Sequence, residues 1–229
     1  MFHAFRRAKS IHLSMTALMS TAVRLGARSP DSLVVLFHGL TGDVRSLQTF
    51  CSTWIRQRPT TQFVFVEAQH TSARGGRDWF KFQRSRDDCA NEEEFLEEVV
   101  FPAIRRCQDE VSAALDELQT ELELANDRVV LAGFSQGAAV AAYAGLARGV
   151  AGVLPMGGPC PPRKQLLPEP GVTKVCAVLG DSDPYVKVDS VQGAFARYPG
   201  RVHSIPGLGH TVGEVHVEVG SSFLAELFD

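Results

Sequence analysis

Short apolar runs alternate with amphipathic segments along most of the chain. The run at 33–37 (Leu-Val-Val-Leu-Phe) is continuously apolar and partly β-branched, which is typical of a strand buried on both faces. Similar runs predict further strands at 62–66, 128–132, 150–155, 172–179 and 202–205. The segments between them predict helices at 44–58, 91–125, 136–148, 188–198 and 213–228. This alternation predicts a parallel sheet that helices cover on both faces.

The longest helical segment carries its own start and break signals. Asn91 precedes three glutamates at 92–94, and acids in a first turn interact favourably with the helix dipole. Pro102 predicts a break or kink, because proline removes a helical hydrogen bond. Beyond it the apolar positions with helical spacing are Val111, Leu115, Leu118 and Leu122. The preceding segment 69–90, rich in Gly, Arg, Ser and Asp, is expected to be an irregular loop.

Length and composition favour one globular domain. The chain has 229 residues, of which 45% are hydrophobic and 21% charged. We expect the domain at 31–229, after a basic extension at 1–30. The net charge of −3 disfavours a nucleic-acid partner, and no apolar run reaches the length of a membrane-spanning helix.

The compartment is suggested by the N-terminus and by the cysteines. No acid precedes Asp31, and this composition resembles an organellar transit peptide; the alternatives are a basic extension that stays attached and a start site placed upstream of the domain. The basic residues concerned are Arg6, Arg7, Lys9, Arg24 and Arg28. The five cysteines lack CxxC spacing, so we expect buried thiols and a reducing compartment, the cytoplasm or an organelle. They are Cys51, Cys89, Cys107, Cys160 and Cys176.

The strongest chemical signal is the pentapeptide Gly133-Phe134-Ser135-Gln136-Gly137. It follows the predicted strand 128–132 and opens a predicted helix of small residues. A GxSxG turn at such a position strains the serine backbone, needs neighbours without bulk, and lifts the hydroxyl above the sheet. Ser135 is therefore the candidate nucleophile. The alternative is a tight turn with an idle serine.

A serine hydroxyl needs a base, and His210 is the candidate. It follows Gly207-Leu208-Gly209 in the loop after the last predicted strand and before the last predicted helix. His203 is expected within a strand and His216 within a helix, and His70 precedes the serine, so all three fit worse. An idle surface histidine is the alternative for His210.

The acid should follow the predicted strand 172–179. Gly180-Asp181-Ser182-Asp183-Pro184 offers two carboxylates, and Asp183 lies further beyond the strand end, towards the histidine. We expect Asp183 to orient His210 and Asp181 to shape the turn. A developing oxyanion needs two donors, for which we expect the backbone amides of Gln136 and Leu40.

Taken together, these motifs resemble the acyl-protein thioesterase, or phospholipase/carboxylesterase, family of the α/β-hydrolase superfamily. The resemblance rests on His38-Gly39-Leu40, the elbow around Ser135, the turn around Asp183, and Gly209-His210. Trp79-Phe80 falls where that family has a Trp-Phe pair lining the site. It implies an α/β-hydrolase fold, with a mostly parallel sheet, helices on both faces and a small or absent lid.

The resemblance also implies an activity. We expect hydrolysis of acyl thioesters or esters, first of all protein S-depalmitoylation, without a metal or organic cofactor. Small-molecule carboxylesterase or lysophospholipase activity and an inactive binding protein remain as alternatives. The expected partners are an acylated protein or a lipid or small ester, with transient membrane-surface contact, for a monomer or weak homodimer. Trp79, Phe80 and Leu208 are expected to bind the acyl chain.

One segment departs from the family pattern. Lys81 stands where an acid often follows Trp-Phe, and Arg74, Arg77 and Arg84 add positive charge nearby. We hypothesise that this segment favours substrates near anionic groups or a membrane surface. A solvated loop is the alternative.

Overall fold

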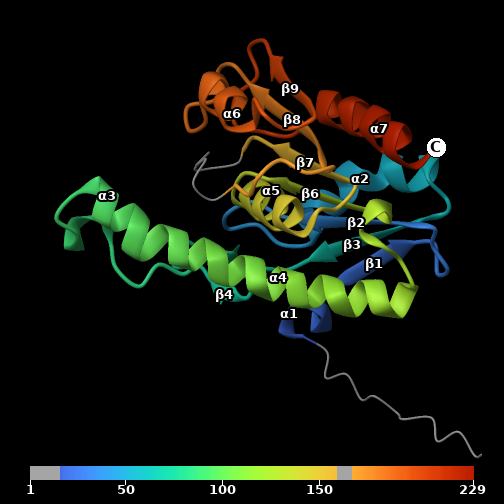
Figure 1. Ribbon diagram of the computed structural model, residues 1–229, viewed down its shortest axis with the longest axis horizontal. Helices are drawn as coiled ribbons and strands as arrows, with labels where there is room; N and C mark the ends of the chain where they lie inside the picture. Colours follow the sequence, from blue (N-terminus) through green and yellow to red (C-terminus); the bar gives the residue numbers. More distant parts are fainter. Residues whose placement is uncertain (1–15, 159–166) are drawn as a thin grey trace, which may run out of the picture.

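A seven-stranded sheet runs through the centre of the computed structural model, which describes residues 16–158 and 167–229 (Figure 1). The strand order is β1-β3-β2-β6-β7-β8-β9, and all neighbours are parallel except β1 and β3. The strands are β1 (Val23–Gly26), β2 (Ser32–Phe37), β3 (Thr61–Val66), β6 (Val129–Phe134), β7 (Gly152–Met156), β8 (Lys174–Gly180) and β9 (Gly200–Ile205). The expected mostly parallel sheet is confirmed.

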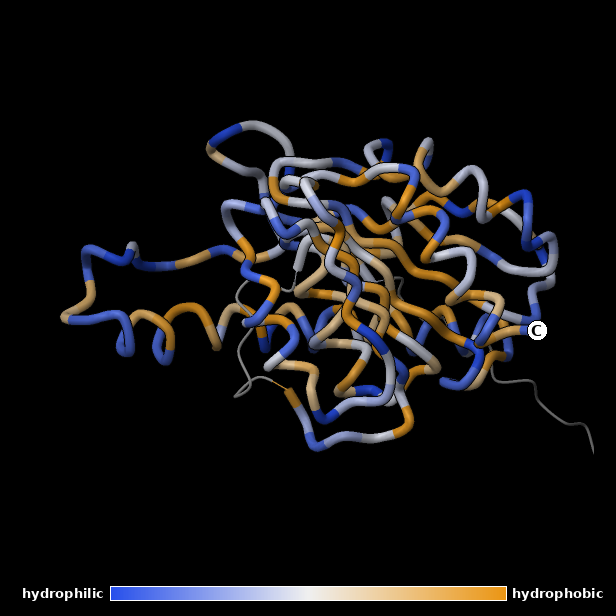
Figure 2. The backbone as a smooth tube through the Cα atoms, turned by 90° about the horizontal axis from the view of Figure 1, so that it is seen from above, coloured by the Kyte–Doolittle hydropathy of each residue, from blue (hydrophilic) through white to orange (hydrophobic). Residues whose placement is uncertain are grey.

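Helices cover both faces of the sheet, and the sheet separates two apolar cores. One core packs beneath α4 (Phe101–Leu122), α5 (Gln136–Arg148) and α6 (Val188–Phe195). The other packs beneath α2 (Arg45–Gln57) and α7 (Glu214–Phe228). Figure 2 shows the apolar strands running between these layers. Every residue of β2 and β3 is buried, as the apolar runs at 33–37 and 63–66 predict for most of their length.

The N-terminal boundary expected near residue 30 is corrected by the structure. The short helix α1 (Ala17–Ser20) buries Leu18 and Met19, and β1 pairs antiparallel with β3. An ion pair of 2.6 Å joins Arg24 to Glu121 on α4. Residues 16–30 thus belong to the domain. β1 gives little sequence signal because it is short and only half-buried at the sheet edge. The proposed cleavage of a transit peptide concerns mainly 1–15, which lie outside the described residues.

The segment expected as an irregular loop at 69–90 contains small ordered elements. Strands β4 (His70–Thr71) and β5 (Arg77–Asp78) form a hairpin, and a 3-10 turn covers Arg86–Asp88. The hairpin was not predicted because two-residue strands have no measurable alternation. No helix in the described ranges is both long enough and apolar enough to span a bilayer.

The long helical segment begins at Asn91, whose side chain accepts a hydrogen bond of 2.9 Å from the Glu94 amide. It runs as α3 (Glu92–Phe95), a π-helical turn η2 (Leu96–Val100) and then α4. Pro102 lies in the first turn of α4, so the predicted break is found directly before it. Figure 1 shows α3 projecting beyond the sheet. This projection forms one wall of the cavity described below.

Cys51, Cys89, Cys107 and Cys176 are free and buried, as expected. Burial raises the pKa of the thiols of Cys51, Cys107 and Cys176, so these three stay protonated. Cys160 lies outside the described residues.

Candidate active site

Ser135 stands on a sharp turn between β6 and α5. Its φ of 54° lies in the left-handed region, which costs energy for a residue with a side chain. The turn is held by the Ser135 amide, which donates to the Met156 carbonyl at 2.9 Å. The flanking glycines leave no room for a side chain. A Cβ on Gly137 would lie 2.1 Å from the Phe37 carbonyl oxygen.

This crowding yields a stability prediction. Replacing Gly137 with alanine should lower the free energy of unfolding by about 3 kcal/mol or more, since rigid backbone atoms must move. The matched control is Gly193→Ala, also inside a helix, where an added Cβ meets no atom within 4 Å. Gly193→Ala should raise stability by up to about 1 kcal/mol. Thermal unfolding followed by circular dichroism compares the two. Equal melting temperatures would contradict the steric argument.

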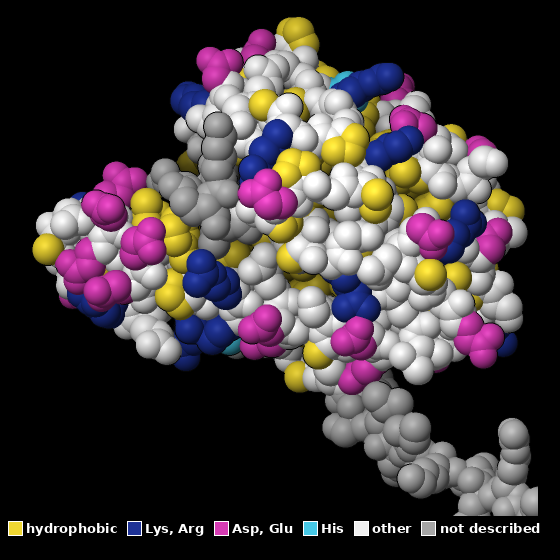
Figure 3. All heavy atoms as spheres, viewed as in Figure 1, with side chains coloured by type: hydrophobic (Ala, Val, Ile, Leu, Met, Phe, Trp, Pro, Cys, Tyr) yellow, Lys and Arg dark blue, Asp and Glu magenta, His cyan; other side chains and the backbone are white. Residues whose placement is uncertain are grey.

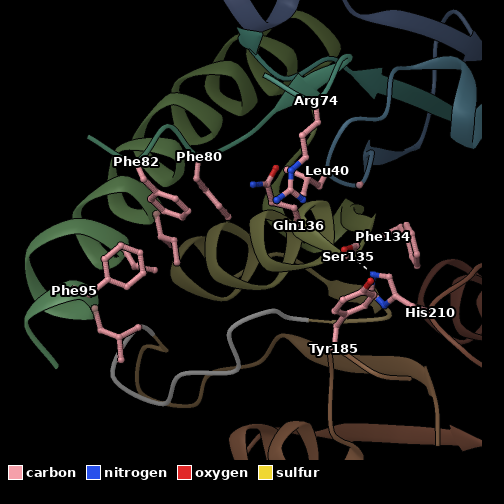
Figure 4. A pocket seen from close by; sticks show the side chains of 14 residues that line it. Leu40, Arg74, Phe80, Phe82, Phe95, Phe134, Ser135, Gln136, Tyr185 and His210 are labelled. Carbon is pink, nitrogen blue, oxygen red and sulfur yellow. Dashed lines mark hydrogen bonds between the residues drawn. The ribbon is translucent and has the colours of Figure 1, made fainter. Parts of the chain in front are cut away.

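The structure brings His210 and Asp183 together with Ser135, although the three lie in separate loops. His210 Nε2 lies 2.8 Å from Ser135 Oγ, and His210 Nδ1 lies 2.6 Å from Asp183 Oδ2. Figure 4 shows the imidazole beside the serine hydroxyl. The rings of Phe134 and Tyr185 lie 4.9 and 5.0 Å from the imidazole and limit its movement. Such a chain of contacts can pass a proton from serine to histidine.

The two carboxylates of the 180–184 turn have different surroundings. Asp183 is 2% exposed, and its Oδ1 accepts the amides of Tyr185 and Val186 at 2.8 and 3.1 Å. Asp181 is exposed and accepts the Gly207 amide at 2.8 Å, so it shapes the turn as expected. Only Asp183 contacts the histidine.

The other described histidines lie away from the serine. His203 is in β9, His216 is buried in α7 and His70 is in β4, as expected for the first two. None of them lines the cavity that contains Ser135. His3 and His12 lie outside the described residues.

The loop after β2 is held by the imidazole of His38. This side chain is 1% exposed, and burial lowers the pKa of His38, which keeps the ring neutral. Its Nε2 accepts the Ala68 amide at 3.1 Å, so its Nδ1–H donates to the Gly39 carbonyl at 2.7 Å. The Gly42 amide donates to the same carbonyl at 3.0 Å. His38 thereby fixes the peptide between Gly39 and Leu40.

This arrangement leaves two amides available to a ligand. Because the Gly39 carbonyl points towards His38, the Leu40 N–H of the same trans peptide points the opposite way. The Gln136 amide is the first of α5, where N–H groups have no helical partner. Neither amide donates to any atom in the described part of the chain. Both residues line the cavity at Ser135, so they could bind a developing oxyanion there.

Ser135 opens into a cavity of about 590 Å³. Its reactive end also contains Arg74, Tyr185 and His210. The other end is an apolar arm, lined by Phe80, Phe82, Phe95, Leu96, Val100 and Ile104. Figure 4 shows these aromatic side chains facing one another, and Figure 3 shows apolar surface between the projecting α3 and the body. The arm suits an apolar chain.

Two of the three expected acyl-binding residues are corrected. Phe80 lines the cavity, but Trp79 and Leu208 do not. Trp79 is 3% exposed and packs edge-on against Phe37; its indole N–H donates to the His38 carbonyl at 2.8 Å. Its amide also donates to the Gln136 side chain at 2.8 Å, so it supports the walls rather than forming one. The Leu208 carbonyl accepts the Ser182 amide at 3.1 Å, and this contact ties the acid loop to the histidine loop.

The remaining residues of the apolar arm were not singled out in the sequence. The sequence gives little indication of their role. The spacing of Phe95, Leu96, Val100 and Ile104 is also typical of the buried face of an ordinary α-helix. The π-helical turn changes the direction of these side chains. Only their place in the tertiary structure makes them face a cavity.

The positive charges of the 74–86 segment are separated in the structure. Arg84 is ion-paired with Glu94 and Glu98 at 2.8 and 2.9 Å, and Arg77 donates to the Gln69 carbonyl at 3.4 Å. Arg74 lines the cavity. The described residues contain no group of histidine, cysteine or carboxylate side chains placed to hold a metal ion.

Comparison with known proteins agrees with this geometry. The family described as Phospholipase/Carboxylesterase matches residues 19–227. Esterase PE8 has a similar structure, with a TM-score of 0.74 and 26% identity over 90% of this chain and 98% of that chain. SOBER1 from Arabidopsis thaliana gives a TM-score of 0.65 at 18% identity, over 86% of this chain and 99% of that one.

A carboxylesterase from Bacillus cereus gives a TM-score of 0.67 at 16% identity, over 90% of this chain and 94% of that one. At these lower identities the likeness shows the shared fold alone. The family match spans nearly the whole domain. The chain therefore belongs to the phospholipase/carboxylesterase family of serine esterases, within the α/β-hydrolase superfamily.

Proposed function

We propose that this chain hydrolyses fatty-acyl thioesters and esters, with S-acylated cysteines of proteins as the substrate, which makes it a protein S-depalmitoylating enzyme. The observation that carries the proposal is the apolar arm that opens directly onto Ser135. An esterase for small polar acyl groups would gain nothing from an arm with three phenylalanines. Burial of a chain there contributes about 0.8 kcal/mol for each methylene.

The reaction proceeds in two acyl-transfer steps. Ser135 Oγ attacks the acyl carbonyl carbon while His210 Nε2 takes the hydroxyl proton, and Asp183 stabilises the imidazolium. The tetrahedral oxyanion accepts hydrogen bonds from the Leu40 and Gln136 amides. Collapse expels the thiolate or alkoxide, which leaves with the proton from His210. Water then attacks the acyl-serine by the same route and releases the fatty acid.

The test is a panel of substrates that differ in one feature at a time. S-acylated peptides from acetyl to palmitoyl are compared with oxygen esters of the same chains and with lysophosphatidylcholine. We expect kcat/KM to rise about fourfold for each added methylene until the arm is full. A maximum at acetyl or butyryl would contradict the proposal and favour a small-molecule carboxylesterase. Preference for lysophosphatidylcholine over the palmitoyl peptide would favour a lysophospholipase.

Blocking the arm should remove the chain-length preference. Leu96 is half-buried and lines the arm, so a tryptophan there fills space that the chain would occupy. Leu96→Trp should lower kcat/KM for palmitoyl substrates about tenfold or more relative to acetyl substrates. The control is Glu97→Trp, one position along, exposed and outside the cavity lining. If both variants keep the wild-type ratio, the acyl chain does not use this arm.

An inactive hydrolase-fold binding protein is the rival from another class. A fluorophosphonate probe reacts with an activated serine, so it separates the two proposals before any substrate is known. We expect rapid labelling of the native protein. No labelling, or equal labelling after Ser135→Ala, would favour the binding protein.

A further inference from the structure

The charge at the reactive end of the cavity is positive. Among the described residues that line it, Arg74 is the one permanent cation, and no carboxylate lines it. Figure 4 shows the Arg74 side chain reaching from the hairpin side towards Leu40 and Gln136. These two residues carry the amides expected to bind the oxyanion. A positive group at this position faces any substrate that occupies the site.

Among the described residues Arg74 has no internal partner for its guanidinium, in contrast to six arginines that do. Arg24, Arg58, Arg84, Arg128, Arg148 and Arg197 are ion-paired with carboxylates. In the described part of the chain the Arg74 guanidinium has no hydrogen bond or ion pair. Its donors therefore remain free for a ligand, and a guanidinium binds a carboxylate or phosphate through two parallel hydrogen bonds.

The backbone of Arg74 is fixed relative to the reactive end. The Arg74 amide donates to Ser72 Oγ at 3.2 Å, and the Ser72 amide donates to the Gly76 carbonyl at 3.1 Å. Gly76 packs so tightly that a Cβ there would lie 1.9 Å from the Thr41 carbonyl oxygen. The Thr41 amide donates to the Arg77 carbonyl at 3.0 Å. The turn that carries Arg74 is thus docked on the loop that carries the Leu40 amide.

The open side of the cavity determines which part of the substrate meets this cation. The apolar arm holds the acyl chain under the proposed function, on which this inference rests. The thiol or alcohol part then lies at the mouth, where Arg74 and Leu40 are exposed. We propose that Arg74 recognises an anionic group, a carboxylate or a phosphate, in the leaving group of the substrate. Acidic side chains or a terminal carboxylate beside an acylated cysteine, and the phosphate of a lysolipid, share this chemistry.

Matched thioesters test the inference. The octanoyl thioester of 3-mercaptopropionate carries a carboxylate in the leaving group, and that of 3-mercaptopropionamide is its neutral isostere. Thiol release at low salt should show that the wild-type protein prefers the carboxylate. Arg74→Gln should lower the ratio of the two kcat/KM values about tenfold, chiefly through KM, because the contact exists before and during reaction. Arg74→Lys should retain part of the preference, and added salt should reduce it.

Two further pairs of substrates show which anion is recognised and whether it lies in the leaving group or in the acyl group. Octanoyl thioesters of 2-mercaptoethyl phosphate and 2-mercaptoethanol test the phosphate, and a larger Arg74 effect there than on the carboxylate pair would point to a lysolipid. Succinyl and butyryl thioesters of 3-mercaptopropionamide place the carboxylate on the acyl side. An Arg74 effect confined to the succinyl pair would overturn the inference.

The control for net charge is Arg105→Gln, an exposed position on α4 outside the cavity lining, which should leave every ratio unchanged. Equal loss in Arg105→Gln and Arg74→Gln, or no change in either, would also overturn the inference. Failure of the proposed function has a different signature. In that case the neutral octanoyl thioester itself would not be cleaved by wild-type protein above the level of Ser135→Ala.

Discussion

Replacing Ser135 with alanine is expected to lower kcat for every acyl substrate on the order of 10⁶-fold. The reason is that, within residues 16–158 and 167–229, Ser135 carries the one hydroxyl that lies against the candidate base His210. Ser135 Oγ lies 2.8 Å from His210 Nε2, and the strained turn aims it into the cavity. Removing it forces direct attack by water, which the Leu40 and Gln136 amides and substrate binding assist only in part. Stopped-flow release of nitrophenol from an octanoyl ester measures both the burst and the steady rate.

The control is Ser182→Ala, because Ser182 is a second serine near the site, directly before Asp183. Ser182 is exposed and its hydroxyl donates to Asp181, not to the histidine. We expect Ser182→Ala to keep the burst and the fluorophosphonate labelling. Circular dichroism should show the same fold in both variants. A Ser135→Ala protein that retains the burst would mean that another group forms the acyl intermediate.

Replacing Asp183 with asparagine is expected to lower kcat on the order of 10⁴-fold while leaving the fold intact. Asp183 Oδ1 accepts two backbone amides, so the carbonyl oxygen of asparagine must occupy that position. Its NH₂ group then replaces Oδ2 and donates to His210 Nδ1. The histidine is forced into the tautomer with a proton on Nε2, which cannot accept the proton of Ser135. Steady-state rates with the octanoyl ester measure the loss.

Asp181→Asn is the matched control, because Asp181 belongs to the same turn but only bonds the Gly207 amide and the Ser182 hydroxyl. An amide oxygen can accept both of these bonds, so we expect a rate within about threefold of wild type. A large loss in Asp181→Asn with a small one in Asp183→Asn would exchange the roles of the two carboxylates. Thermal unfolding of both variants excludes a loss caused by unfolding.

The local pattern of apolar and polar residues was sufficient to predict most of the strands and helices. The apolar run at 33–37 and the small-residue helix at 136–148 correspond to β2 and α5, because burial on both faces requires those compositions. The same pattern predicts which loops follow the carboxyl ends of the strands. Ser135, Asp183 and His210 could therefore be expected to meet, since parallel strands deliver their loops to one edge of the sheet. Their catalytic roles remain predictions for the variants above.

Elements without periodicity could not be predicted in this way. β1 is a four-residue strand that contains a glycine and an arginine, and it is held by the edge of β3 and by contacts with α4. Its stability comes from partners distant in sequence. For that reason the sequence pattern placed the domain boundary too late, near residue 30.

What the sequence by itself determined is the order of strands and helices along the chain and the chemistry of the loops, because the hydrophobic period, the turn residues and the GxSxG motif are local properties of the sequence. Only the tertiary structure decided which side chains face the cavity. Trp79 turns into the core and Leu208 joins two loops, whereas Phe82 and Phe95 converge on the apolar arm. The physical reason is that a cavity is bounded by residues from separate elements, and the π-helical turn before Pro102 sets the direction of one wall.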